Sequence, residues 1–462
     1  MRLPEPWTAA VAAAARERGI TVEQAGGPEL LRLGNGRHRR LVGAAMTDRT
    51  SAVGVAVSCD PGLRGRLLRD LGLPVAAGQP AEALPAGRDY HAVVVAGQII
   101  CATEWAPDPD TGSPAARSGR DVTDRVHPDV GELCRRATAA VGLDIAGVCL
   151  RLPDIAAPLA PTGAGGRPEA VITDLTTGPE LCPDARPDAT ADHRAGRAIV
   201  DALFPPGTPS RVPTVAVAGG TTTAECVARL LADGGRRVGL AGTDRVLVAD
   251  RPVAYRTGTG PWAARLVLGD PTVDVAVITV VPDGRAGDEV GYDWTDVAVI
   301  AGAGAGAGAV VAARVRDGGT LVLRADECAD DLLADPRVRA THKRVVLFDP
   351  DPAHPTIRRH AQAGGCAYVL DAGWLTQLRD CYKVRVAPVD ELPGANRDRS
   401  GQRVLDALAA IAAAAAHGLS PATIRRLLGT LDDGEPAGPA GTVLSFDAPA
   451  GTDQPAEARQ AA

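Results

Sequence analysis

Apolar and polar residues alternate in two different ways along this 462-residue chain. In the first 205 residues, stretches with helical periodicity are interspersed with short apolar runs, which predicts an α+β domain. The predicted elements are helices near Trp7 to Arg18, Pro61 to Leu71 and Pro128 to Val141, and strands near Ser51 to Val57 and His91 to Cys101. Two segments rich in Pro, Gly and Asp, at Thr103 to Asp121 and Ala160 to Pro168, are predicted loops.

After residue 211 the pattern becomes a regular succession of short apolar strands and helices. Such a succession predicts a mostly parallel, doubly wound sheet with helices on both faces. The predicted strands are Thr214 to Val217, Val238 to Ala241, Val273 to Val281, Asp296 to Ile300, Thr320 to Leu323 and Arg344 to Phe348. The predicted helices are Thr222 to Ala232, Pro261 to Leu268, Ala307 to Arg316 and the alanine-rich Leu405 to His417, which Gly418 would close.

Proline and glycine divide the chain into three predicted parts. The segment Phe204 to Val212 contains adjacent prolines and a Gly-Thr-Pro run, which cannot continue a helix or a central strand. We therefore expect domains at 1–205 and 211–431, followed by a disordered tail at 432–462 that is rich in Pro, Gly, Asp and Ala. The repetitive AGAGAGAG from Ala301 is expected to be a mobile loop entering a helix.

Composition narrows the function classes. The net charge is −7 and the pI is about 5.7, which does not suit a nucleic-acid-binding surface, and the basic run Arg37 to Arg40 is short. Nine cysteines occur without CxxC or Cys/His spacing, so neither a disulfide framework nor structural zinc is predicted. With no signal-peptide pattern and no run of 18 apolar residues, we expect a cytoplasmic protein that does not enter a membrane.

The strongest candidate for chemistry is the strand, glycine turn and helix in PTVAVAGGTTTAECVARLL, residues 213–231. A phosphate-binding loop presents backbone N–H groups and a helix N-terminus to the anion, and adds a lysine for the phosphates. Here no lysine is present, since the chain contains only Lys343 and Lys383. Two interpretations of this turn stay open: a tight turn with a threonine N-cap, or a vestigial anion-binding site. The residues of the turn are Gly219, Gly220, Thr221, Thr222 and Thr223.

Other residues offer weaker signals. Asp283, Arg285 and Asp288 follow an apolar strand at the sheet edge where α/β folds bind ligands, so they are candidates for substrate or anion contact, although a solvated loop is the simpler interpretation. His354 and His360 are expected on the surface. Cys226 is expected to be a buried structural cysteine, the alternative being a thiol activated by the helix N-terminus.

Collinear segments of both halves resemble cyanophycin synthetase, which joins an ATP-grasp domain to a Mur-ligase-like domain. The segments that carry the resemblance are Leu30 to Val75, Arg88 to Ile100, Val141 to Ile155, Ala198 to Pro206, VAVAGGTTT, Gly258 to Ile278, Gly284 to Ile300, Leu321 to Glu327 and Leu405 to Ser420. The resemblance implies an ATP-grasp-like α+β domain, followed by a sheet like the Mur-ligase central domain. It also implies ATP and Mg²⁺ as cofactors and an ATP-dependent amino-acid ligase activity.

The family's site motifs are mostly missing at the matching positions. The chain is much shorter than the family between Gly78 and Arg88, and Cys149 stands where an acidic residue is expected. Asp174 and Glu180 are weak metal candidates in place of the family's Glu-x-Asn pair, so no metal site and no cofactor is predicted with certainty from the residues. The family's GTNGKTTT loop is shortened to Gly219 to Thr223, and AGAGAGAG replaces its Asp-His segment.

These departures lead to two functional hypotheses. The first is a truncated, non-catalytic relative, a pseudoenzyme that forms a homo- or hetero-oligomer and assists an intact ligase paralogue. The second is an active amino-acid or peptide ligase with a rebuilt nucleotide site, used in specialised metabolism. Losing several cationic and metal groups at once opposes phosphoryl transfer, which favours the first hypothesis. A reaction without nucleotide is a third option, but the sequence offers no defined nucleophile or base for it.

Overall fold

The computed structural model divides into two compact units, Met1–Arg211 (unit 1) and Val212–Ala462 (unit 2), each described here by itself. The predicted division into 1–205 and 211–431 stays a prediction, and the predicted tail at 432–462 lies outside the described residues. The structure describes residues 6–27, 29–43, 45–76, 84–107, 117–159, 169–178, 189–255, 260–280, 290–302, 305–326, 328–379, 382–395, 398 and 400–429.

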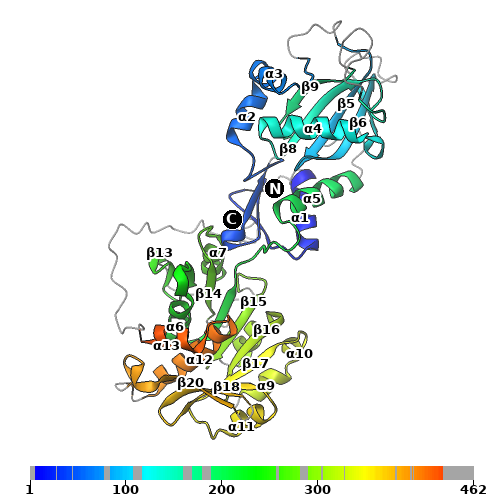
Figure 1. The fold of residues 1–462 in the computed structure, drawn as a ribbon. Coiled ribbons are helices and arrows are strands. Elements are labelled where there is room, and N and C mark those ends of the chain that lie inside the picture. The colour runs from blue at the N-terminus through cyan, green and yellow to red at the C-terminus, as the bar shows by residue number, and fades with distance from the viewer. Residues whose placement is uncertain are drawn as a thin grey trace, which may run out of the picture. The chain divides into compact units, whose positions relative to one another are not determined.

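Unit 1 is built on a five-stranded antiparallel sheet with helices on both faces (Figure 1). Its strand order is β7 (Arg117–Asp121), β6 (Gln98–Pro107), β5 (Arg88–Val95), β8 (Ile145–Leu152) and β9 (Val171–Thr176). The helices are α1 (Pro6–Glu17), α2 (Ala52–Cys59), α3 (Pro61–Asp70), α4 (Pro128–Val141) and α5 (Ala189–Leu203). A smaller antiparallel sheet contains β1 (Val22–Gln24), β2 (Leu30–Leu33), β3 (Arg40–Gly43) and β4 (Met46–Thr47).

The two faces of β5 enter separate hydrophobic cores. Tyr90, Ala92 and Val94 pack with residues of α3 and α4, whereas Val93 and Val95 pack with α1 and α5. Successive side chains of a strand point to opposite faces, so a sheet covered on both faces is apolar at almost every position. This is why the RDYHAVVV segment shows little alternation.

Three predicted elements of unit 1 are wrong. The predicted strand at Ser51 to Val57 is the helix α2, because the Ser51 hydroxyl accepts a hydrogen bond from Gly54 N at 3.2 Å and caps the helix. The predicted strand His91 to Cys101 is a hairpin, turning at Ala96 (φ 48°) and Gly97 (φ 79°). The predicted loop from Thr103 instead continues β6 to Pro107 and includes β7, while residues 160–168 lie outside the described residues.

Unit 2 contains an eleven-stranded sheet whose central strands are parallel, which confirms the predicted doubly wound α/β class. The parallel strands, in spatial order, are β11 (Val238–Ala241), β14 (Val275–Val280), β10 (Thr214–Gly219), β15 (Thr295–Ala301), β16 (Val315–Arg324), β17 (Arg344–Phe348) and β18 (Cys366–Asp371). Antiparallel strands extend both edges: β12 (Arg245–Val248), β13 (Arg251–Tyr255), β19 (Trp374–Arg379) and β20 (Tyr382–Pro388).

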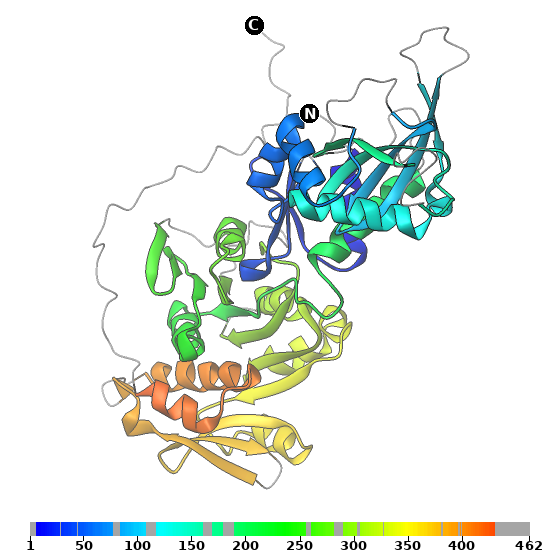
Figure 2. The same cartoon turned by 45° about the horizontal axis from the view of Figure 1, so that its top comes forward.

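Helices cover both faces of this sheet (Figure 2). On one face lie α6 (Thr221–Leu231), α12 (Gln402–Ala416) and α13 (Pro421–Leu428). On the other lie α7 (Pro261–Gly269), α8 (Ala305–Ala313), α9 (Cys328–Ala334), α10 (Pro336–Arg339) and α11 (Pro355–Gln362). The strand β16 starts at Val315, so the predicted helix Ala307 to Arg316 runs too far.

Within the described ranges, no helix is both long enough and apolar enough to cross a lipid bilayer.

Candidate functional site

The glycine turn of unit 2 is shorter than a phosphate-binding loop. Strand β10 ends at Gly219 and helix α6 starts at Thr221, so Gly220 alone separates them. The turn lies at the carboxyl edge of the sheet, where Gly219 pairs with Ala301 of β15 and Ala218 pairs with Val280 of β14. A phosphate loop needs several successive backbone N–H groups around the anion, and one connecting residue cannot provide that cradle.

The two glycines of the turn have different roles. Gly219 has a φ of 148°, and a Cβ on it would lie 3.0 Å from the Ala301 carbonyl oxygen. Glycine is therefore required there by backbone conformation and by the neighbouring strand. Gly220 is the N-cap of α6 in an extended conformation, with no side-chain cap. The predicted threonine N-cap is wrong, because Thr221, Thr222 and Thr223 all lie within the first turn of the helix.

Thr223 is fixed to another helix. Its buried hydroxyl donates a hydrogen bond to Asp406 Oδ1 of α12 at 2.5 Å, and Gln402 Nε2 donates to the same oxygen at 3.0 Å. Asp406 is 3% exposed. Burial raises the pKa of its carboxyl above the usual range, while the bonds from Thr223 and Gln402 act in the opposite direction. The hydroxyl is thus engaged within the protein.

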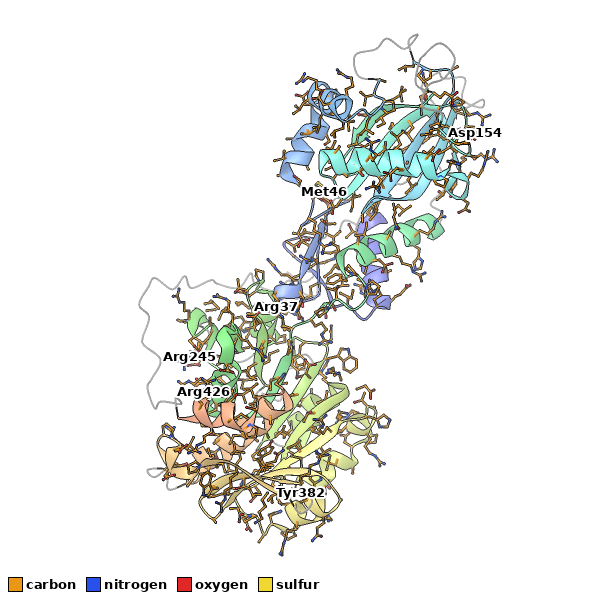
Figure 3. All side chains as sticks on the ribbon, in the orientation of Figure 1. Arg37, Met46, Asp154, Arg245, Tyr382 and Arg426 are labelled. Atoms are coloured by element: carbon orange, nitrogen blue, oxygen red, sulfur yellow. The ribbon has the colours of Figure 1, made fainter. Side chains whose placement is uncertain are left out.

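Further polar contacts hold α6 in place. Thr221 and Thr243, which follows β11, have their hydroxyl oxygens 3.0 Å apart. Arg245 of β12 pairs with Glu225 of α6 at 2.8 Å, and Arg426 of α13 pairs with Asp233 at 2.6 Å; both arginines are labelled in Figure 3. These contacts favour a rigid start of the helix over a loop that closes on a ligand.

Thr279 lies beside this turn on β14, opposite Val217 of β10. It is 3% exposed, and its hydroxyl has no hydrogen-bond partner among the described residues. Strand β14 then ends at Val280, beside Ala218. The candidate residues that follow it, Asp283, Arg285 and Asp288, lie outside the described residues.

Both lysines lie away from the turn. Lys343 immediately precedes β17, three strands from β10, and its ammonium donates to the carbonyl oxygen of Val338. Lys383 lies on the edge strand β20 and pairs with Asp371 at 2.7 Å. Neither lysine therefore replaces the cation that a phosphate loop would need.

The structure shows the surroundings of three residues that the sequence singled out, Cys226, His354 and His360. Burial raises the pKa of the Cys226 thiol to about 12, so the helix N-terminus does not activate it and the structural interpretation is favoured. His354 caps α11 through a hydrogen bond from Thr356 N at 3.3 Å. His360 is half-buried; its Nε2 atom is buried with no hydrogen-bond partner among the described residues, and burial lowers its pKa.

Unit 1 has a cavity of about 600 Å³ on its five-stranded sheet, lined by Cys149 and Asp174 among others. Asp174 Oδ1 lies 2.5 Å from Arg64 Nη2 and also accepts a hydrogen bond from Leu175 N. Arg151 forms a bidentate pair with Asp89 at 2.7 and 2.9 Å. The arginine pairs occupy carboxylates that a metal would need.

Glu180, the second metal candidate, lies outside the described residues. Throughout the part of the chain that the structure describes, no group of three or more His, Cys, Asp or Glu side chains is placed to hold a metal ion.

Sequence reasoning missed Asp406, Thr243 and the pair Arg245–Glu225. Asp406 had a usable signal, because it is the one acidic residue in the apolar segment LDALAAIAAAAAH. A carboxylate on the buried face of a helix requires a partner. Its partner, Thr223, is 183 positions earlier in the chain, so only the fold could identify it.

The fold and the site define an α/β protein with a strand, a one-residue turn and a helix at the carboxyl edge of a doubly wound sheet. No protein-family model matches the chain. It is 31% identical over 324 residues to cyanophycin synthetase from Synechocystis sp. strain PCC 6803, covering 66% of this chain and 36% of the relative. It is 25% identical over 564 positions to cyanophycin synthetase from Trichormus variabilis, covering 92% of this chain and 62% of that relative.

The chain is a partial relative of the cyanophycin synthetases, and it spans only about a third of the length of the first curated relatives it matches. The Trichormus alignment is longer than this chain, so that relative contains internal residues with no counterpart here.

Solved structures similar to parts of the chain include two ligases. One is a bifunctional glutathione synthetase from Pasteurella multocida, at 13% sequence identity and a TM-score of 0.36. The match covers 43% of this chain and 44% of that chain. The other is UDP-N-acetylmuramoylalanyl-D-glutamyl-2,6-diaminopimelate–D-alanyl-D-alanyl ligase from Acinetobacter baumannii, at 14% sequence identity and a TM-score of 0.33. The match covers 47% of this chain and 46% of that chain. The family relationship rests on the sequence relatives.

Proposed function

We propose that this chain is a non-catalytic member of the ATP-dependent ligase family, working as an accessory subunit with an intact ligase paralogue. The observation that carries the proposal is the direct passage from β10 to α6 through Gly220 alone. The family builds amide bonds from carboxylates, and that chemistry requires a nucleotide whose phosphates are held and neutralised. A degenerate phosphate loop of this kind removes the means of holding them.

The chemistry of the turn supports the same proposal. Phosphoryl transfer depends on cations that stabilise charge spreading over the transferred group, and losing one such group commonly costs on the order of 10²- to 10³-fold in rate. Here the loop lysine is absent and the Thr223 hydroxyl is bonded to Asp406. Arg245, which reaches helix α6 from strand β12, is paired with Glu225.

An accessory role is consistent with what the chain retains. Both faces of the sheet in unit 2 are packed with large apolar cores, so the scaffold is intact although the loop is not. A stable scaffold without a phosphate cradle suits binding to a partner better than turnover. The partner we infer is a paralogue with a complete loop, in a hetero-oligomer.

Nucleotide binding tests the catalytic half of the proposal. The purified chain would be titrated with ATP and Mg²⁺ by isothermal titration calorimetry up to millimolar nucleotide, and ADP release would be measured with amino acids present. We expect no saturable heat and no ADP above the buffer rate. An intact cyanophycin synthetase under the same conditions is the positive control. ADP release that requires an amino acid would instead establish an active ligase with a rebuilt nucleotide site.

Partner binding needs a separate experiment. The chain would be tagged and recovered from its native cells, and the associated proteins identified by mass spectrometry. We expect a ligase with a complete GTNGKTTT loop, and we expect its activity or assembly size to change when this chain is added to the purified ligase. Recovery without any ligase, together with no effect on an added paralogue, would contradict the accessory role.

A further inference from the structure

Unit 2 has a second cavity, of about 340 Å³, that lies at the opposite edge of the sheet from the Gly219 turn. It is formed at the amino ends of the parallel strands β17 and β18, beside Thr320 in the middle of β16, and by the antiparallel strand β19. The last turn of α12 lies over these strands and contributes only alanines, Ala412, Ala415 and Ala416. Because these side chains are small, the end of the helix leaves space above the sheet.

Strand register brings polar side chains together on the floor and rim of this cavity. Thr320 pairs with Arg344 across β16 and β17, and Tyr368 pairs with Gln377 across β18 and β19. Cys366 pairs with Arg379 on the same two strands. In each case the strand alternation places these side chains on the face that α12 covers, where Val322, Val346 and Leu375 belong to the same core.

The charged side chains among the described residues that line the cavity are all positive. Arg344 and Arg379 are both exposed, and neither guanidinium group forms a hydrogen bond or ion pair with a residue that the structure describes. No aspartate or glutamate is among the described residues that line the cavity. Other arginines of unit 2, such as Arg316 and Arg425, are paired with carboxylates. Two guanidinium groups at one cavity, with no carboxylate partner among the described residues, match an oxyanion such as a carboxylate or a phosphate.

The floor adds neutral hydrogen-bonding groups. Gln377 Nε2 donates to Cys366 Sγ at 3.1 Å, which orients the amide. Tyr368 is 3% exposed, and burial raises the pKa of its phenol, so the hydroxyl remains protonated at neutral pH. Thr320 is 5% exposed. Hydroxyl groups therefore lie beside the apolar surface of alanine and valine side chains. This combination favours a small ligand that has both an anionic group and a hydrocarbon portion.

We propose that this cavity binds a small organic anion, whose carboxylate or phosphate group is held by Arg344 and Arg379. The volume is at the lower end of the usual range for ligand pockets, roughly 300 to 1,000 Å³, which limits the ligand to a small metabolite. The proposal does not depend on nucleotide binding, because the cavity is at the amino edge of the strands and the Gly219 turn is at the carboxyl edge.

Ligand titration of matched variants tests the proposal. The purified full chain would be titrated with succinate and, separately, with inorganic phosphate by calorimetry, at constant ionic strength set with chloride. We expect saturable binding of at least one anion, weakened about tenfold or more by Arg344→Gln or Arg379→Gln, since each removes a charge-assisted contact. Arg358→Gln is the control, because Arg358 is an exposed arginine on α11, which packs on the other face of the sheet.

A steric variant separates a built cavity from simple charge attraction. Ala416→Leu on α12 fills the space and keeps both arginines, so we expect it to abolish binding while thermal unfolding stays cooperative. Tighter binding of succinate would identify a carboxylate ligand, and tighter binding of phosphate would identify a phosphorylated one. Equal loss in Arg358→Gln, unchanged binding in Ala416→Leu, or no saturable binding of either anion would overturn the proposal.

Discussion

The hydroxyl of Thr223 on α6 donates a hydrogen bond to the carboxylate of Asp406 on α12, at 2.5 Å. This contact joins the first turn of the helix after the glycine turn to a helix almost two hundred positions later. It also places a threonine of the glycine turn's helix inside the protein's own hydrogen-bond network. The contact therefore ties the start of α6 to α12.

Removing the Thr223 hydroxyl should destabilise the fold. Thr223→Val leaves the buried Asp406 carboxylate with one fewer donor, and a buried polar group that loses its partner costs about 1–3 kcal/mol. The measurement is the free energy of unfolding in urea. Thr222→Val is the matched control, because Thr222 is exposed on the same turn and should change stability by less than about 0.5 kcal/mol. Equal effects of the two substitutions would argue against the contact.

The buried carboxylate of Asp406 predicts a specific pH dependence. Its pKa is raised in the folded state, so its favourable contribution is fully present below the unfolded value of 3.8 and is lost as pH rises through the folded pKa. Asp406→Asn keeps an oxygen acceptor for Thr223 and cannot ionise. We therefore expect the stability of Asp406→Asn relative to the natural chain to increase with pH from about 4 upward. A flat difference in urea unfolding across that range would contradict this expectation.

His417, which caps the end of α12, predicts the opposite dependence. Burial lowers its pKa, and Arg236 and Arg316 lower it further, while Asp296 acts the other way. The His417 imidazole therefore takes up a proton more readily in the unfolded chain than in the folded chain. The free energy of unfolding then falls as the pH decreases below about 6.5. His417→Gln should reduce this acid loss in urea unfolding experiments. Exposed His342 supplies the control, and His342→Gln should leave the profile unchanged.

The two glycines of the turn should respond differently to alanine. Gly219→Ala would give a residue with a Cβ a φ of 148°, which side chains rarely allow. The new Cβ would also lie 3.0 Å from the Ala301 carbonyl oxygen. Strain of this kind costs about 1–3 kcal/mol. In Gly220→Ala the new Cβ would meet only the Thr223 hydroxyl oxygen, at 4.0 Å, so the substitution should cost less than about 1 kcal/mol. Thermal unfolding of both variants measures the difference, and a larger loss in Gly220→Ala would show that the turn is built differently.

The pattern of apolar and polar residues was sufficient to predict several elements of both units. Strands β11 and β17 and helix α4 of unit 1 have the bounds that the sequence predicts, because their signals are local: an apolar run, a proline at the first turn, a glycine at the end. The edge strands β12, β13, β19 and β20 were missed. Their pairing depends on tight turns such as Ala249–Asp250 and Ala372–Gly373, in which non-glycine residues adopt positive φ against their local preference.

The candidate site divides in the same way. The sequence by itself established that a glycine turn follows a buried strand, that no lysine accompanies it, and that the class is α/β, since these depend on residue identity and short-range periodicity. Only the tertiary structure decided that Gly220 is the whole connection, that Thr223 is bonded to Asp406, and that Arg64 pairs with Asp174. Such contacts join residues more than a hundred positions apart, and the free energy of burying a polar pair depends on the fold that brings its members together.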